Sequence, residues 1–207
     1  MIRLISAFCL SLLAASAGAE DIAPDALIKG ISDDVIGIIK QDKDIKAGDR
    51  KKIDALVDAK VLPHFNFARM TALAMGRNWP KANAAQRDAL ITEFRNLLVR
   101  TYSGALSTYK DEVIEFKPLR AAPGDTDVTV RTQVKRPGNA PVSIDYSMEK
   151  TPTGWKVYDV VVGGVSLVTN YRDSFNAEIR ASGVDGLIKS LSDKNRSLEP
   201  QGGAASK

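Results

Sequence analysis

The chain has 207 residues, of which 44% are hydrophobic and 26% are charged, a composition that excludes a disordered or fibrous protein and suits one globular domain. Lysine and arginine number 29 against 25 acidic residues, and because this excess forms no basic tract the sequence predicts no nucleic-acid partner. A single cysteine and a single histidine exclude an internal disulfide and a histidine-rich metal site.

Residues 1–19 have the organisation of a secretory signal peptide. Arg3 supplies the positive charge, residues 4–15 form a short apolar core, and Ala17-Gly18-Ala19 is a small-residue cleavage site. A membrane anchor is the less favoured interpretation, because the apolar run is shorter than the ~18–20 residues that span a bilayer. We therefore expect cleavage after Ala19 and a mature chain in the periplasm, where its lack of cysteine avoids oxidation of stray thiols.

Two amphipathic helices are predicted at the start of the mature chain. Residues 27–39 follow Pro24, a residue suited to the first helical turn, and place apolar side chains three and four positions apart. Residues 53–61 repeat this spacing. Leu62-Pro63 ends the second helix, because a proline disfavours helical geometry in the residue before it.

Two further helices follow. Residues 64–75 are apolar on most faces, which predicts a buried helix, and Gly76 ends it. Asn83 lies three residues before Gln86, the spacing of a capping box, and marks the start of the next helix. Apolar residues three and four apart continue without a proline, so this helix is predicted over residues 84–109.

The apolar period then changes to two, which indicates β-strands. Turn residues separate alternating runs, and such short connections favour antiparallel neighbours because a parallel crossover needs about a dozen residues. The predicted fold class is therefore α+β, a four-stranded antiparallel meander with helices packed on its one apolar face. The runs are residues 114–117, 128–135, 142–149 and 155–162, the last with apolar residues on both faces.

Helical spacing returns after the last strand. Apolar residues at 167–179 form one stripe, and Gly183 separates it from a second stripe at 184–191. The end of the chain is rich in glycine, alanine and serine, and we expect a disordered tail over residues 197–207. This organisation assigns residues 20–196 to a single folded domain.

The sequence carries none of the common catalytic or phosphate-binding motifs, such as G-x-S-x-G, H-E-x-x-H, the Walker A loop, G-x-G-x-x-G or C-x-x-C. We therefore predict no catalytic residue, cofactor or metal site, and we interpret His64 as a partly buried structural residue. An enzyme is the alternative, because Asp145, Tyr146 and Asp159 are available to a sheet-lined pocket of the kind found in cone-shaped α+β isomerases.

An apolar sheet face beneath apolar helices has two interpretations. Sheet and helices either pack into a filled core or leave a gap that holds an apolar ligand. The hydrophobic pattern alone does not distinguish these two arrangements, because aromatic and sulfur-bearing side chains serve both of them.

Two segments of the chain resemble the toluene-tolerance (Tol-Tol-Ttg2) family. The first reads HFNFARM at 64–70 and ALAMGRNW at 72–79, and the second reads GWKVYDV at 154–160 and GVSLV at 164–168. Their order and spacing match over about residues 25–195, and neither segment is a catalytic motif. Members of this family include the periplasmic phospholipid-binding protein of the maintenance-of-lipid-asymmetry (Mla) pathway.

The resemblance implies a soluble periplasmic carrier of glycerophospholipids, with acyl chains in a cavity between the sheet and the helices and the head group near the opening. It also implies two partners, an inner-membrane ABC transporter complex with an MCE-type domain and an outer-membrane lipoprotein complex, between which the carrier moves lipid. The alternatives are a carrier of another apolar ligand such as a hopanoid or quinone, a cone-fold enzyme, and a structural adaptor with a filled core.

Candidate site residues combine this resemblance with the apolar patterns. Arg69, Arg77 and Arg172 lie in family-like segments and are candidates for the head group, because a guanidinium binds phosphate through two hydrogen bonds. Val165 follows Gly163-Gly164, where a sharp change of direction is expected, and is assigned to the opening. The candidate acyl-chain contacts are Met70, Leu73, Phe94, Leu98, Tyr102, Val130, Val134, Ile144, Tyr146, Met148, Val165, Leu167 and Tyr171.

Overall fold

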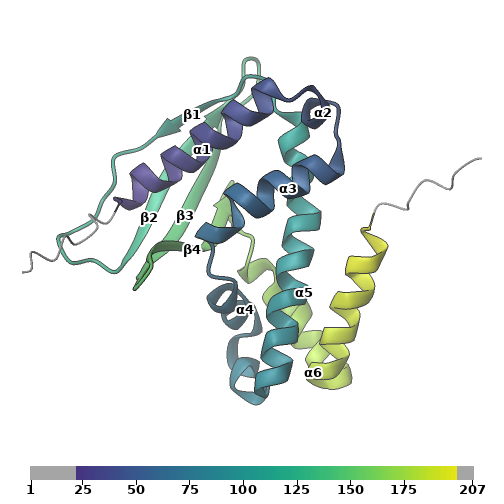
Figure 1. Ribbon diagram of the computed structural model, residues 1–207. Coiled ribbons are helices and arrows are strands. Elements are labelled where there is room, and N and C mark those ends of the chain that lie inside the picture. The colour runs from purple at the N-terminus through teal and green to yellow at the C-terminus, as the bar shows by residue number, and fades with distance from the viewer. Residues whose placement is uncertain (1–21, 200–207) are drawn as a thin grey trace, which may run out of the picture.

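A computed structural model of the protein describes residues 22–199. The signal peptide predicted over residues 1–19 lies outside the described residues, as do positions 200–207 of the predicted tail. Figure 1 shows a twisted sheet crossed by the first helix, beside a bundle formed by later helices. No helix within residues 22–199 is long and apolar enough to cross a membrane.

The sheet confirms the predicted α+β class and antiparallel meander, and it adds a fifth strand. The fifth strand is only two residues long, which is too short for alternation in the sequence to reveal it. Gly163 and Gly164 have φ values of 58° and 88° and form the two-residue turn that folds this strand back onto the fourth. The strands are β1 (Val113–Phe116), β2 (Asp127–Lys135), β3 (Val142–Thr151), β4 (Gly154–Val162) and β5 (Val165–Ser166).

Alternation along the strands turns one face of the sheet toward the helices. In β2, Val128 and Val130 are buried whereas Arg131 is exposed. Val128 pairs across the sheet with Met148 of β3, which is also fully buried. The even-numbered positions of β2 and β3 therefore face the helices, and the odd-numbered positions face away from them.

A β-bulge explains why the fourth run carries apolar residues on both faces. Met148 of β3 pairs with Val157 of β4, but the preceding Ser147 pairs with Asp159. Tyr158 is thus an extra residue on β4, and it shifts the alternation by one position. The bulge depends on the pairing of two strands, so a period of two along one strand does not predict it.

The first helix, α1, lies across the buried face of the sheet (Figure 1). Its Ile28 packs in one hydrophobic cluster with Val128 and Trp155 of the sheet. Farther along α1, Val35 and Ile39 belong to a second cluster with residues of α3. The amphipathic stripes predicted in this region therefore face two different partners. The helices are α1 (Pro24–Gln41), α2 (Lys43–Lys46) and α3 (Arg50–Lys60).

A capping residue determines where each of the next two α-helices begins. The side chain of Asn66 accepts a hydrogen bond from the backbone N–H of Arg69, so the helix predicted from residue 64 begins after this cap. Both bonds of the predicted capping box between Asn83 and Gln86 are present. The elements are the 3-10 helix η1 (Leu62–His64), α4 (Phe67–Met75), the 3-10 helix η2 (Gly76–Lys81) and α5 (Ala84–Tyr102).

The α-helical part of α5 is shorter than the predicted helix, and the chain continues as a 3-10 helix, η3 (Ser103–Thr108). Two contacts with α3 hold this change of geometry. Arg50 donates a hydrogen bond to the backbone oxygen of Arg100 at 3.0 Å, and the Ser103 hydroxyl donates to Asp54 at 3.2 Å. Both contacts join residues about fifty positions apart, so helical periodicity within α5 does not predict them.

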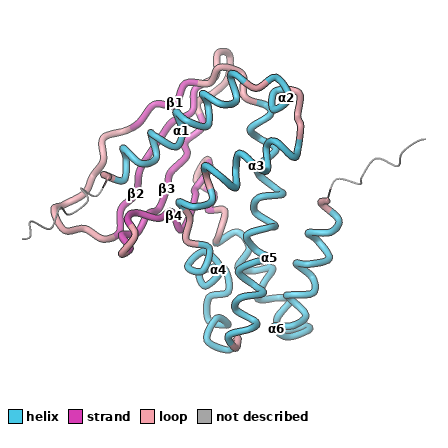
Figure 2. The backbone as a smooth tube through the Cα atoms, viewed as in Figure 1, coloured by secondary structure: helices cyan, strands magenta, loops and turns pink. Residues whose placement is uncertain are grey.

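Gly183 divides the last helix, α6 (Arg172–Ser197), into two segments, as the sequence predicts, and its φ of 74° reverses the chain. In the first segment, Phe175 packs on Phe94 of α5 with ring centroids 5.2 Å apart. The second segment runs back along α5, where Asn195 donates a hydrogen bond to an α5 backbone oxygen at 2.9 Å. Figure 2 shows α6 beside α5 at the bottom of the bundle.

The folded region extends into the predicted tail. Ser197 is the last residue of α6, and Leu198 packs against the core of the helical bundle. Glu199 forms an ion pair with Arg100 of α5 at 2.9 Å. The fold therefore continues to the last described residue instead of ending at 196, because these side chains find partners on α5 that a composition argument does not consider.

Candidate functional site

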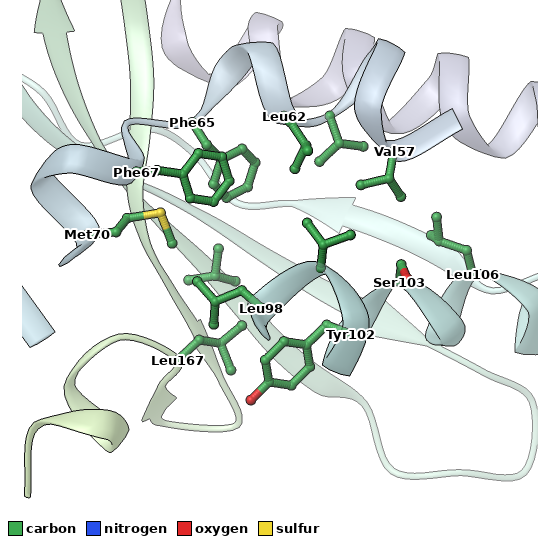
Figure 3. Close-up of a pocket in the computed structure, with 13 residues that line it drawn as sticks. Val57, Leu62, Phe65, Phe67, Met70, Leu98, Tyr102, Ser103, Leu106 and Leu167 are labelled. Carbon is green, nitrogen blue, oxygen red and sulfur yellow. The ribbon is translucent and has the colours of Figure 1, made fainter. Parts of the chain in front are cut away.

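The first of two apolar cavities lies where α3, α4 and α5 meet β4, and its volume is about 200 Å³. Figure 3 shows Phe65 and Phe67 on one side and Tyr102 on the other, with the tyrosine hydroxyl directed away from the two phenyl rings. The Ser103 hydroxyl in its wall is satisfied by Asp54. The lining residues are Val57, Val61, Leu62, Phe65, Phe67, Met70, Leu98, Val99, Tyr102, Ser103, Leu106, Val160 and Leu167.

The second cavity lies between α1, η3 and strands β1 to β3. Its volume is about 410 Å³, which falls in the ~300–1,000 Å³ range of ligand pockets. Val61, Phe65 and Leu106 line both cavities, so the two spaces adjoin across these side chains. The lining residues are Ile28, Ile31, Ser32, Val35, Ile36, Ile39, Val61, Phe65, Ala105, Leu106, Thr108, Tyr109, Glu112, Ile114, Val134, Arg136, Ile144 and Tyr146.

The charged groups of the second cavity gather at one end. Arg136 donates a hydrogen bond from Nε to Glu112 at 2.6 Å, and a second one from Nη2 to the same oxygen. Burial acts to raise the pKa of Glu112, but the Lys110 backbone N–H and the Arg136 guanidinium outweigh it and lower the pKa overall. Glu112 is therefore ionised at neutral pH. This end lies at the surface, because the Arg136 side chain is 41% exposed.

The side chains that an enzyme of the cone-shaped class would use do not converge. Asp145 is on the outward face of β3 and lines neither cavity. Asp159 is buried beside β5, where it accepts hydrogen bonds from the Ser166 hydroxyl and from two backbone N–H groups. Tyr146 lines the second cavity, and burial raises the pKa of its phenol. Residues 22–199 contain no cluster of three metal-ligating side chains.

The structure brings part of the predicted acyl-contact set together around the cavities. Seven of these residues are in cavity walls: Met70, Leu98, Tyr102 and Leu167 in the first, and Val134, Ile144 and Tyr146 in the second. The other residues lie elsewhere. Phe94, Val130 and Met148 are in the packed core, and Leu73 packs against it. The Tyr171 ring packs edge-on against Phe94, and Val165 is 55% exposed.

The three arginines predicted for a head group are outside both cavities. Arg69 forms an ion pair with Asp127 at 2.8 Å and lies 3.5 Å from the centroid of the Tyr158 ring. Arg172 donates two hydrogen bonds to the backbone oxygen of Leu73. Arg77 is exposed on η2. The first two thus hold elements together, and head-group binding by these arginines stays a prediction.

The strand alternation contains a signal that could have revealed the charged end of the second cavity. Arg136 follows the end of β2 in phase with the buried Val130 and with Val134. Glu112 precedes β1 in phase with Ile114, which lines the same cavity. A charged residue at each inward-facing position is an exception to the alternation, and such exceptions mark sites where polar groups meet an apolar pocket.

Comparison with known proteins places the chain in a family. Residues 29–193 match the family model described as "MlaC protein". The chain belongs to the MlaC family. This finding confirms the resemblance to the toluene-tolerance proteins, since a further MlaC relative is "Toluene tolerance protein ttg2D" of Pseudomonas putida. That protein is 25% identical over 197 residues, covering 89% of this chain and 83% of the relative.

Two other proteins are similar to this MlaC-family chain. "Intermembrane phospholipid transport system binding protein MlaC" of Haemophilus influenzae is 23% identical over 172 residues, which cover 82% of this chain and 80% of the relative. A solved structure of a phospholipid-binding protein from Ralstonia solanacearum, in complex with a phospholipid, is 41% identical with a TM-score of 0.80. It covers 87% of this chain and 100% of that chain.

Proposed function

We propose that this protein binds a two-chain phospholipid in the adjoining cavities and carries it across the periplasm. The observation that carries the proposal is the pair of apolar spaces that meet at Val61, Phe65 and Leu106, with charged groups at one surface end. The similar Ralstonia solanacearum protein, whose structure holds a phospholipid, supports it. The partners are an outer-membrane lipoprotein complex and an inner-membrane ABC transporter complex with an MCE-type domain.

The need for a carrier follows from the cost of hydrating acyl chains. Two chains of common length contain about 30 methylenes, and exposing them costs ~0.8 kcal/mol each, or roughly 24 kcal/mol in total. Free diffusion of such a lipid through water is therefore negligible. A protein that shields the chains removes this barrier, and the two adjoining cavities suit acyl chains because their lining is almost entirely apolar.

The alternatives fit these observations less well. A structural adaptor with a filled core does not account for the two cavities. A quinone or hopanoid ring system lacks an ionised head group, and so does not use the Arg136–Glu112 pair at the end of the second cavity. An enzyme needs a positioned acid or base, and the carboxylate in the lining of the second cavity, Glu112, is already engaged by that arginine.

Denaturing mass spectrometry of the purified mature protein tests the proposal. We expect the extracted ligand to be a glycerophospholipid with two acyl chains, in an amount comparable to that of the protein. The same spectrum gives the mass of the protein. If the protein is exported and cleaved, we expect the mass of a chain that begins at Glu20. A quinone, a hopanoid or no extractable ligand from protein purified without detergent would contradict phospholipid carriage.

Val165→Glu tests the opening predicted at the turn between β4 and β5. Val165 is 55% exposed and lies two positions before Leu167, which lines the first cavity. Because the new carboxylate stays in water, we expect an unchanged thermal melt. A carboxylate beside the wall of the first cavity is expected to oppose the entry of an acyl chain and to lower co-purified lipid about threefold, or roughly 0.7 kcal/mol. Full retention of lipid by the folded variant would show that acyl chains do not pass this turn.

A further inference from the structure

We propose that Glu112 and Arg136 form a head-group site that selects a zwitterionic phospholipid bearing a primary ammonium group. This inference rests on the proposed function, because it assumes that the cavities hold a phospholipid. Arg136 would bind the phosphate and Glu112 would bind the ammonium group, so both charges of the head group would be paired. The site is distinct from the three arginines that the sequence predicts.

The geometry of the pair leaves room for a ligand. Nε and Nη2 of Arg136 are engaged by Glu112, and Nη2 also donates to the backbone oxygen of Thr108 at 3.2 Å. The remaining nitrogen, Nη1, makes no hydrogen bond within residues 22–199. A guanidinium has five N–H donors, so Arg136 retains donors for a phosphate. Its side chain is 41% exposed, whereas that of Glu112 is 10% exposed.

The surroundings of Glu112 keep it charged and in place. Its Oε2 accepts a hydrogen bond from the backbone N–H of Lys110 at 2.6 Å, and its Oε1 accepts from Arg136. Because Nε and Nη2 of Arg136 both donate to Oε1, the lone pair that remains is on Oε2, and it can accept a further hydrogen bond from an ammonium. Because Glu112 lines the apolar cavity, an ammonium bound there is partly withdrawn from water, where a charged hydrogen bond is stronger.

The pair lies at the place where a head group would emerge. Val61, Phe65 and Leu106 line both cavities and connect the second cavity to the first. Beside the charged end, Val113 is 62% exposed and Val142 is 43% exposed. A lipid with its chains in the cavities and its head group at Arg136 therefore has its polar part at the surface.

The charge order gives the selectivity. A head group with phosphate and ammonium completes an alternating series of Arg136, phosphate, ammonium and Glu112, in which every neighbour is opposite in sign. An anionic head group without an ammonium brings its phosphate to Arg136 but offers no cation of its own to Glu112, so two negative charges share one arginine. A quaternary ammonium carries the positive charge but has no N–H to donate to the carboxylate. The expected order is therefore phosphatidylethanolamine above phosphatidylcholine above phosphatidylglycerol.

A competition experiment measures this order. Lipid-free protein is equilibrated with vesicles of phosphatidylethanolamine, phosphatidylcholine and phosphatidylglycerol in equal parts with identical acyl chains, reisolated, and extracted for mass spectrometry. For the unmodified protein we expect phosphatidylethanolamine to exceed phosphatidylglycerol about fivefold, which corresponds to roughly 1 kcal/mol for one additional charged hydrogen bond. Glu112→Gln is expected to bring this ratio within about twofold of one, because it lowers the amount of phosphatidylethanolamine that is bound.

Two further variants complete the test. Glu115→Gln removes the same charge from β1 at a position that pairs with Lys117 and Lys135 and lines neither cavity, so its ratio should equal that of the unmodified protein. Arg136→Gln should lower uptake of all three lipids, because each contains phosphate. Phospholipid uptake without preference, or a preference that survives in Glu112→Gln, overturns the head-group site alone. No uptake of any phospholipid overturns the proposed function as well.

Discussion

Leu106→Glu is expected to lose at least about nine-tenths of the bound lipid, because it places a carboxylate in the wall that the two cavities share. A lipid bound there would have to remove that carboxylate from water without offering it a partner, and a tenfold loss of affinity requires only about 1.4 kcal/mol. Lipid that co-purifies with the variant, quantified by mass spectrometry against protein, measures the effect.

Two other variants separate lipid loss from loss of the fold. Thr92→Glu adds the same charge at an exposed position of α5 and should retain lipid fully. Leu106→Trp fills the junction of the cavities without adding charge, so it should also lower lipid content while leaving a cooperative thermal melt. If Leu106→Glu and Leu106→Trp both fold and carry as much lipid as the unmodified protein, the cavities are not the lipid site.

Phe94→Ala is expected to lower the free energy of unfolding by about 4 kcal/mol, the usual cost of removing a large aromatic ring from a packed core. The Phe94 side chain is 0% exposed, and its ring lies edge-on to those of Tyr171 and Phe175 at 5.1 and 5.2 Å between centroids. It joins α5 to the start of α6, so its loss leaves a void between two helices. Urea titration of lipid-free protein measures the difference.

Lipid-free protein is needed because a bound ligand adds its own stabilisation to the folded state. Phe94→Leu is the matched variant: it keeps an apolar side chain at the same position and should cost much less than the alanine variant. If Phe94→Ala lowers the free energy of unfolding by less than about 1 kcal/mol, the helices must move together to fill the void. That result would contradict the close packing expected of a core.

The sequence by itself determined the features that depend on near neighbours. Alternation predicts the long strands, and the capping box at Asn83 and Gln86 predicts where α5 begins. Gly183, with a φ of 74°, is the predicted break between the two segments of α6. Each of these features is settled within a few residues, through side-chain direction, one hydrogen bond or one backbone conformation, and is therefore visible in a short stretch of sequence.

Tertiary structure decided which apolar side chains face a partner and which face a space. Phe94 and Leu98 lie one helical turn apart on the same stripe of α5, yet Phe94 is enclosed by aromatic rings of α6 and Leu98 lines the first cavity. The hydrophobic effect is non-directional, so both positions satisfy the same pattern. Whether a void remains depends on how α3, α4 and β4 meet, and these elements are distant in sequence.

Tertiary structure also decided which arginines lie at a cavity and which form ion pairs elsewhere. Arg69 and Arg136 both carry a guanidinium that can bind phosphate, but of the two only Arg136 lies at a cavity, because it follows β2 in phase with the inward-facing even positions. Arg69 instead reaches Asp127, 58 positions away in the chain. An arginine is attracted to whichever anion the fold brings near, so its role is set by long-range placement and not by its immediate neighbours in sequence.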